Sequence, residues 1–210
     1  MLIDFRQLFP KYGIKPKGVL HVGANKGEEY PVYMELGITK QIWVEAYKPV
    51  FETLKHTVRE NPEAICWNAC VGDENQKVTF HVSNNGSQSS SILELGTHAQ
   101  VHPEVHYIQD IEMNMVKLQD LFASPFVNAS NYDFLNMDLQ GAELKALKGL
   151  GDLINGFRWA YLEVNEKELY KGCALVEDID YYLGAYGFSR KETKWCGNTS
   201  WGDSLYVKDQ

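Results

Sequence analysis

The sequence predicts an α/β fold with a doubly wound, mostly parallel sheet, a terminal antiparallel hairpin and a small β insertion between strands three and four. Three observations predict it. Short apolar runs typical of buried strands alternate with segments of helical spacing over most of the chain. A polar stretch flanked by alternating segments interrupts this order once, at residues 77–118. Two further alternating segments, 187–192 and 203–207, flank a loop and indicate the hairpin.

The composition limits the class of protein. With 210 residues the chain is long enough for a substantial core, and we expect a single domain over residues 1–210. A net charge of −8 and scattered Lys and Arg argue against a nucleic-acid partner. We expect no membrane span and a cytoplasmic location, because the start lacks a signal-peptide pattern and no stretch approaches roughly 20 apolar residues. The four cysteines lack zinc-site spacing and are expected to be free.

The regular elements follow from periodicity and from the residues that bound them. Residues 1–17 are expected to form a short amphipathic helix, broken by Pro10 and Gly13, that covers the sheet or a ligand cleft. Five apolar runs between turn residues are expected to be parallel strands: 19–22, 41–44, 64–71, 132–138 and 159–164. Helices are expected where apolar residues recur at helical spacing, with proline only in first turns: 28–35, 49–61, 143–150 and 176–186.

The insertion at residues 77–118 is expected to contact a substrate. Its ends, 77–82 and 111–118, alternate like antiparallel edge strands, and a Ser- and His-rich loop lies between them. Loops at the carboxyl edge of such a sheet often carry substrate contacts, so we expect Ser89, Ser90 and His106 to bind substrate. A mobile surface loop is the alternative interpretation.

The first strand ends in a glycine turn, Gly23 to Gly27, that leads into a helix, and Glu45 follows about 20 residues later at the end of strand two. The turn does not match the dinucleotide fingerprint G-x-G-x-x-G, so it favours a nucleoside without a pyrophosphate, of which S-adenosylmethionine is the commonest. We expect Gly23→Val to abolish cofactor binding in a protein that still folds. The alternative is that the glycines only make a tight turn.

Three acids stand at predicted strand ends: Glu45, Asp138 and Glu163. In a parallel sheet these ends share one edge, so the three acids are expected to face one cleft. Asp138 could accept a proton from a substrate hydroxyl or bind an ammonium group of the cofactor. Glu143 could hold a divalent cation, Mg²⁺ or Mn²⁺, with Asp138, or could only favour the helix N-terminus. His21 lies inside strand one and points either at the cleft or into the packing.

Several blocks, in this order and spacing, resemble the FkbM family of S-adenosylmethionine-dependent O-methyltransferases. They are HVGANKG, IWVEAYKPVFETL, NACVGD, SSSIL, VKLQDLF and DFLNMDLQGAELKALKGL. The resemblance implies a Rossmann-like class I methyltransferase with the turn around the methionine moiety, Glu45 on the ribose and residues 68–71 near the adenine. The implied cofactor contacts are His21, Gly23, Ala24, Asn25, Gly27, Glu45, Ala46, Asn68, Ala69, Cys70 and Asp138. Gln140 stands where the family commonly has an acid, which argues against a metal.

The sequence thus predicts methyl transfer to a hydroxyl, with Asp138 as the first candidate for the base and Glu163 as the second. We expect a small-molecule or glycan acceptor, such as a sugar or nucleotide-sugar hydroxyl on a deoxysugar like rhamnose. Trp195 and Trp201 suit a sugar ring, with Asn165 as a further contact, although the tryptophans could equally pack under the hairpin. The alternatives are a small-molecule or protein N-methyltransferase and a non-catalytic adenosine-ligand-binding subunit.

Overall fold

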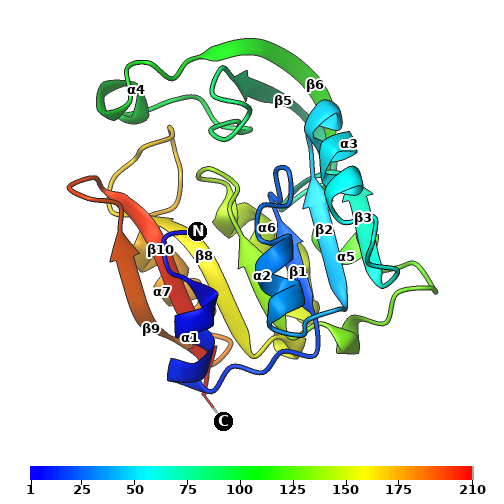
Figure 1. Cartoon of the computed structure of the whole chain (residues 1–210). Coiled ribbons are helices and arrows are strands. Elements are labelled where there is room, and N and C mark those ends of the chain that lie inside the picture. The colour runs from blue at the N-terminus through cyan, green and yellow to red at the C-terminus, as the bar shows by residue number, and fades with distance from the viewer. Residues whose placement is uncertain (210) are drawn as a thin grey trace.

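The computed structural model describes residues 1–209; Gln210, the end of the predicted domain, lies outside them. The chain forms a seven-stranded sheet in the order β3-β2-β1-β7-β8-β10-β9 and a three-stranded sheet in the order β4-β6-β5 (Figure 1). The larger sheet contains β1 (Val19–Val22), β2 (Gln41–Glu45), β3 (Ala64–Asn68), β7 (Phe134–Met137), β8 (Trp159–Asn165), β9 (Phe188–Trp195) and β10 (Trp201–Lys208). The smaller sheet contains β4 (Cys70–Gly72), β5 (Gln76–Ser83) and β6 (Tyr107–Lys117).

The strand directions confirm the predicted fold class. β3, β2, β1, β7 and β8 run parallel, and β10 is antiparallel to both β8 and β9. Parallel neighbours need crossovers, and helices fill these. The helices are α1 (Phe5–Tyr12), α2 (Tyr30–Glu35), α3 (Lys48–Thr57), α4 (His98–Val101), α5 (Leu118–Leu121), α6 (Glu143–Leu150) and α7 (Val176–Gly184), with 3₁₀ turns η1 (Ala129–Asn131) and η2 (Gly151–Gly156). None of the helices within residues 1–209 is long and apolar enough to cross a membrane.

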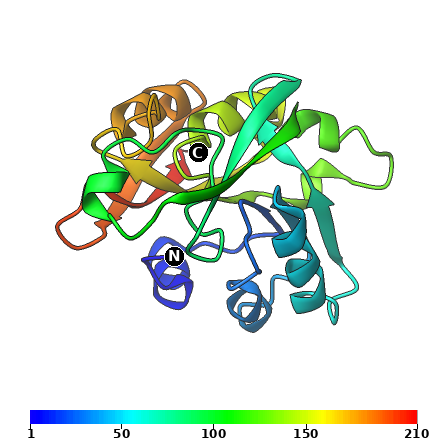
Figure 2. The same ribbon diagram turned by 90° about the horizontal axis from the view of Figure 1, so that it is seen from above.

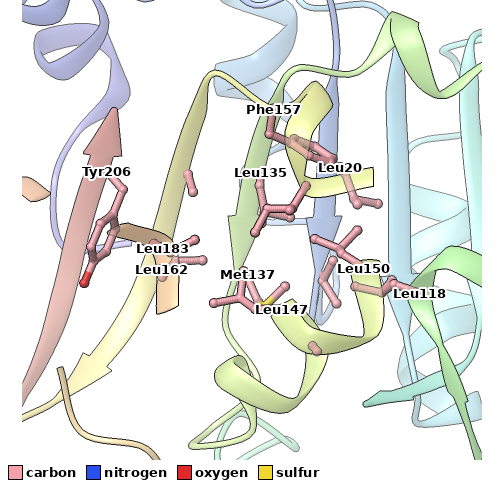
Figure 3. Packing of buried hydrophobic residues seen from close by; sticks show 14 of the residues in the cluster. Leu20, Leu118, Leu135, Met137, Leu147, Leu150, Phe157, Leu162, Leu183 and Tyr206 are labelled. Carbon is pink, nitrogen blue, oxygen red and sulfur yellow. The ribbon is translucent and has the colours of Figure 1, made fainter. Parts of the chain in front are cut away.

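Helices cover both faces of the larger sheet (Figure 2). One face buries an aliphatic layer in which Leu147 and Leu150 of α6 pack against Leu135 and Met137 of β7 (Figure 3). The other face packs α1, α2 and α3 on a layer rich in aromatic side chains. Since both faces of the central strands are covered, β1 and β7 are apolar along nearly their whole length, which is why the sequence identified them.

Helix α1 continues through Pro10, so the predicted break there is wrong. The Asp4 side chain accepts a hydrogen bond from the backbone N–H of Arg6 and caps the helix, and the chain leaves it only at Gly13, where φ is +63°. Phe5 and Phe9 are buried against the sheet. This burial holds the segment helical despite the hydrogen bond that proline removes.

The predicted third strand divides into two strands that belong to different sheets. β3 ends at Asn68, and β4 then pairs in parallel with β6, which in turn pairs antiparallel with β5. The prediction of one strand over 64–71 is therefore wrong. The two antiparallel strands predicted at the ends of the insertion are confirmed as β5 and β6, but β6 is the central strand of the smaller sheet and not an edge strand. Close packing fixes the division, because a Cβ on Gly149 of α6 would lie 2.0 Å from the carbonyl oxygen of Gly72. The insertion forms a sheet of its own that arches over the larger one (Figures 1 and 2).

The terminal hairpin is longer than predicted. β9 and β10 extend to Trp195 and from Trp201, so the expected loop over 193–202 shortens to five residues, 196–200. Thr193 and Ser204 hydrogen-bond across the two strands through their hydroxyl groups at 2.8 Å. Polar pairs of this kind stabilise strand pairing where the residues do not alternate between apolar and polar, so the alternation in the sequence underestimates the length of the strands.

Candidate active site

A cavity of about 570 Å³ opens at the carboxyl ends of β1, β2, β7 and β8, beneath the insertion. Its volume lies in the range of small-molecule and cofactor sites. Glu45, Asp138 and Glu163 all line it, as the shared edge of a parallel sheet requires. The insertion contributes Asn85, Ser87, Gln88, Ser89, Ser90, Ser91 and, from α4 and the segment after it, His98, His102 and Glu104.

The glycine turn brings β1 against the end of β7. Gly23 has a φ of +76°, and a Cβ on it would lie only 1.7 Å from the carbonyl oxygen of Asp138. Position 23 therefore requires glycine for two reasons: the positive φ of the turn and the close packing of β1 against the end of β7. This close contact argues against the expectation that Gly23→Val still folds. The next residues open into the cavity, and Oδ1 of Asn25 is buried there without a hydrogen-bond partner among residues 1–209.

Glu45 is held by backbone donors. Its two oxygens accept hydrogen bonds from the N–H of Asn25 at 3.0 Å and of Tyr47 at 2.7 Å. Burial raises the pKa of Glu45 to about 7, although these donors favour the carboxylate. Each oxygen keeps a further lone pair, so an oriented carboxylate remains available to a ligand hydroxyl.

Gln140 joins the two acids at the ends of β7 and β8. Its Nε2 donates to Oδ1 of Asp138 at 2.6 Å and to Oε2 of Glu163 at 2.8 Å, while its Oε1 accepts a hydrogen bond from the hydroxyl of Tyr170. Gln140 has a φ of +53°, a conformation rare outside glycine, which turns the side chain back over the strand ends. The sequence analysis placed Gln140 beside the acids but did not predict this bridge.

The acids differ in their exposure. Asp138 is open to the cavity although it lies deep in the protein, and desolvation raises its pKa to about 6. Glu163 is 4% exposed, and burial together with the neighbouring carboxylates raises its pKa far above the usual range. Glu163 therefore holds its proton more firmly than Asp138, which is the usual result when two carboxyl groups share one site and one of them is more deeply buried.

Glu143 closes the loop after β7. Its Oε1 accepts hydrogen bonds from the N–H groups of Leu139 at 2.7 Å and of Gly141 at 3.2 Å, and burial raises its pKa to about 7. Carboxylate oxygens of Asp138, Glu143 and Glu163 lie within 4.8 Å of one another and could hold a cation. However, these oxygens already accept hydrogen bonds from backbone N–H groups, at Glu143, and from the Gln140 side-chain amide, at Asp138 and Glu163. The three carboxyl groups are therefore better suited to hold the loop after β7 in place than to bind a metal ion.

Asp203 is a fourth acid in the cavity, which the sequence analysis missed. It lies on β10 directly opposite Glu163, and its Oδ2 accepts hydrogen bonds from the hydroxyl of Tyr161 at 2.7 Å and from the N–H of Leu2 at 2.6 Å. Only the register of the antiparallel pair places it there. No signal in the sequence marks this position, because Asp203 opens the predicted segment 203–207 and is followed by the polar Ser204.

The insertion is anchored on the acidic loop. Ser91 Oγ donates to the carbonyl oxygen of Gln140 at 2.9 Å, and Leu95 forms an isolated bridge with Tyr170. Ser89 and Ser90 line the cavity, as predicted, within a network of serine and asparagine hydrogen bonds. His98, which was not predicted, lines it too, and its Nδ1 is buried without a hydrogen-bond partner in the described part of the chain.

Other predicted residues lie in or outside the cavity for identifiable reasons. His21 lines it but stacks on Trp43 with ring centroids 5.0 Å apart, and burial lowers its pKa to about 3, so it is neutral. Ala24, Ala46, Ala69, Cys70 and Trp201 also line it. The cavity lining does not include Gly27, Asn68, His106, Asn165 or Trp195.

Three of the residues outside the lining are buried or braced elsewhere in the fold. The amide of Asn68 donates to the carbonyl oxygens of Glu45 and Ala46, at 2.9 Å each, and so braces the end of β2. Trp195 packs on the aliphatic layer, which matches the packing alternative for that tryptophan. Asn165 is buried, and neither of its side-chain polar atoms has a partner within residues 1–209.

Comparisons with known proteins agree with this architecture. A curated relative, the 2-O-methyltransferase NoeI of Sinorhizobium fredii, is 24% identical over 164 residues, which cover 73% of this chain and 65% of that protein. A solved protein of the NADB-Rossmann superfamily from Streptococcus agalactiae has a TM-score of 0.55 at 13% identity, covering 99% of this chain and 69% of that one. Magnesium protoporphyrin IX methyltransferase from Synechocystis PCC 6803 has a TM-score of 0.51 at 13% identity, covering 97% and 76%. These two structures show the shared fold.

The family assignment rests on a longer match. Residues 21–190 match the methyltransferase FkbM domain. The matched range contains the glycine turn, Glu45, the whole insertion and the loop from Asp138 to Glu143. The chain therefore belongs to the FkbM family of S-adenosylmethionine-dependent methyltransferases.

Proposed function

We propose that this chain transfers a methyl group from S-adenosylmethionine to a hydroxyl oxygen of a sugar or glycan. The observation that carries the proposal is that one cavity contains both an oriented, buried carboxylate, Glu45, and an accessible, largely ionised one, Asp138. The first is suited to hold a nucleoside, and the second is suited to accept a proton. The relation to the 2-O-methyltransferase NoeI supports oxygen as the acceptor atom.

The residues around the glycine turn fit the cofactor. Glu45 would accept hydrogen bonds from the ribose hydroxyls, and Oδ1 of Asn25, which lacks a partner among residues 1–209, would accept one from a ligand N–H or O–H. Ala69, Cys70 and Val71 line the next part of the wall with apolar groups suited to adenine. When bound, the cofactor supplies an activated methyl group: the S–CH₃ bond breaks as the O–CH₃ bond forms, and S-adenosylhomocysteine leaves.

Asp138 is the base in this proposal. The acceptor hydroxyl has a pKa near that of water, roughly 16, so a carboxylate that receives its proton during transfer contributes about 10²- to 10⁴-fold. Asp138 is open to the cavity, whereas Glu163 is buried and its pKa is raised well above the usual range by that burial. Glu163 therefore supports Asp138 through Gln140 and does not replace it.

The proposal does not require a divalent cation. Gln140 places an amide N–H group between Asp138 and Glu163, and backbone N–H groups engage Glu143. Asp138, Glu143 and Glu163 remain the residues that would hold Mg²⁺ or Mn²⁺ if one bound.

Two measurements test the proposal. Calorimetry with S-adenosylmethionine and with S-adenosylhomocysteine measures cofactor binding, and release of S-adenosylhomocysteine in the presence of a sugar panel measures transfer. We expect saturable binding of both ligands and release that depends on a hydroxylated acceptor. Release with amines but not with hydroxyl compounds would establish an N-methyltransferase instead, and absence of cofactor binding would refute the proposal.

A further inference from the structure

The cavity wall has a one-sided charge. It carries seven carboxyl groups and, among residues 1–209, no lysine or arginine. The carboxyl groups belong to Glu28, Glu29, Glu45, Glu104, Asp138, Glu163 and Asp203. Lys26 neighbours the wall, but its Nζ is directed toward Gly86, where it would lie 3.5 Å from a Cβ. The α-amino group of Met1 is also at the wall, 3.7 Å from Oε1 of Glu29.

The histidines of the wall do not reverse this charge. His21 and His98 both have a pKa lowered by burial, so both are neutral at pH 7. His102 has Nδ1 3.7 Å from Oε1 of Glu104, so a positive charge on it would already face a carboxylate.

The backbone near the acids offers no anion site either. Phosphates are often bound by free N–H groups at a helix N-terminus. In the loop before α6, however, the N–H groups of Leu139 and Gly141 already donate to Glu143, the first residue of that helix. A carboxylate of the chain itself thus engages these two loop N–H groups, which are not free to bind a phosphate.

The acceptor side of the wall offers neutral hydrogen-bonding groups instead. His98 is 5% exposed, lines the cavity, and has its Nδ1 without a partner in the described residues. Gln88 and the serines of the insertion add amide and hydroxyl groups, and Trp201 adds an aromatic face. Such groups donate to and accept from sugar hydroxyls.

We propose that the acceptor of this site is a neutral or amino-bearing sugar or glycan, and that sugars carrying phosphate, nucleoside diphosphate or carboxylate are excluded. The inference rests on the proposed function and narrows it, because it removes nucleotide-sugars from the acceptors that the sequence allows. An anion entering this cavity would lose its hydration and find carboxyl groups in place of the Arg or Lys that usually bind it, and its presence would oppose their ionisation.

The experiment uses matched acceptors on the full chain. Rhamnose, xylose, glucose and glucosamine are each supplied as methyl glycoside, sugar 1-phosphate and nucleoside diphosphate sugar, and S-adenosylhomocysteine release is followed. For every sugar that is methylated, we expect kcat/KM to be at least about 100-fold higher for the glycoside than for either phosphorylated form. An equal or higher value for a phosphorylated form overturns the inference.

Affinity tests the inference even without turnover. The same ligands are titrated calorimetrically into protein saturated with S-adenosylhomocysteine. Equal or tighter binding of a phosphorylated form than of its glycoside overturns the inference, and weaker binding supports it. Failure of the proposed function is distinguishable, because it appears as absent cofactor binding or absent methyl release with every glycoside.

A pair of variants checks the charge argument. Glu104→Lys, at the cavity wall, is expected to improve binding of the phosphorylated forms about 10-fold relative to wild type. Glu112→Lys, at an exposed site on β6, is expected to leave this binding unchanged.

Discussion

The side-chain amide of Gln140 donates a hydrogen bond of 2.6 Å to Oδ1 of Asp138. The same nitrogen reaches Glu163, and the backbone carbonyl of Gln140 accepts a hydrogen bond from Ser91 of the insertion. One residue therefore links the acid that opens into the cavity, the acid buried behind it and the segment that covers them.

Replacement of Asp138 separates its three possible roles. Asp138→Asn keeps the shape of the side chain but cannot accept the proton, so we expect turnover at saturation to fall about 10²-fold or more while cofactor affinity is largely kept. Calorimetry and saturated turnover are measured on both proteins. A raised cofactor dissociation constant with normal turnover would instead make Asp138 a ligand of the methionine ammonium group, and full activity with normal binding would remove it from the mechanism.

The activity of the wild type is expected to depend on pH through Asp138. A base must be ionised, and burial raises the pKa of Asp138 to about 6. The kcat/KM should therefore be highest above pH 7 and should fall tenfold per unit as pH drops well below 6. A profile that stays flat down to pH 5 would contradict this assignment.

Gln140→Glu tests the bridge between the acids. A third carboxyl group beside Asp138 and Glu163 raises the pKa of Asp138 further, so we expect the acid limb of the activity profile to move to higher pH. We also expect the variant to respond to added Mg²⁺, because four carboxyl groups then converge.

The activity of the wild type is expected to be insensitive to a chelator. Loss of this activity on chelation, restored by Mg²⁺ or Mn²⁺, would show that the wild type uses a metal ion.

Replacement of Glu45 measures its contribution to cofactor binding. Glu45→Ala removes two charge-assisted hydrogen bonds to the ribose, so S-adenosylmethionine binding is expected to weaken by about 2 to 4 kcal/mol. Glu52→Ala, at an exposed position of α3, is the matched control and should bind normally. Unchanged affinity of Glu45→Ala in calorimetry would remove Glu45 from the site.

Gly23 and Gly37 provide a matched pair for the packing of the glycine turn. Both have positive φ, +76° and +74°, but a Cβ on Gly23 meets the backbone of Asp138, whereas a Cβ on Gly37 meets nothing within 4 Å. Gly37→Ala is expected to lower the free energy of unfolding by about 1 kcal/mol, from backbone strain alone. Gly23→Ala should lower it by several kcal/mol more, measured by denaturant unfolding. Equal values would mean that the two strands adjust without strain.

Stability is expected to decrease as pH rises through neutrality. Burial raises the pKa of Glu143 to about 7 and also raises that of Glu163, so the folded protein binds more protons than the unfolded chain between about pH 4.5 and 7. The free energy of unfolding should fall by about 2 kcal/mol or more from pH 5 to pH 8. Glu163→Gln should flatten this dependence, and a wild type equally stable at both pH values would show that these acids ionise normally.

The sequence predicted those parts of the fold and site that depend on local patterns. β1 and β7 are apolar because both faces are covered, and the ends of parallel strands share an edge, so the approach of Glu45, Asp138 and Glu163 to one cavity followed from strand order alone. The turn after Val22 could also be predicted from local sequence, because it requires a residue with positive φ and Gly23 adopts one readily.

The features that it did not predict depend on contacts between distant segments. Nothing in the run 64–71 shows that the chain changes sheets at Ala69, because the partner of β4 is β6, about 45 residues later. Asp203 reaches the cavity only through the register of β10 on β8. The role of Gln140 depends on its positive φ and on the positions of two acids, neither of which a residue pattern specifies.

The separate sheet of the insertion has a consequence for how such proteins diverge. Residues 85–105, which form one side of the cavity, lie between β5 and β6, and these strands pair with each other and with β4, while the glycine turn and Glu45 belong to the larger sheet. Acceptor preference can therefore change by replacement of this one segment, provided that Ser91 and its hydrogen bond to Gln140 are retained. A chimaera that carries the corresponding segment of a relative would inherit the acceptor of the donor and the cofactor site of the host.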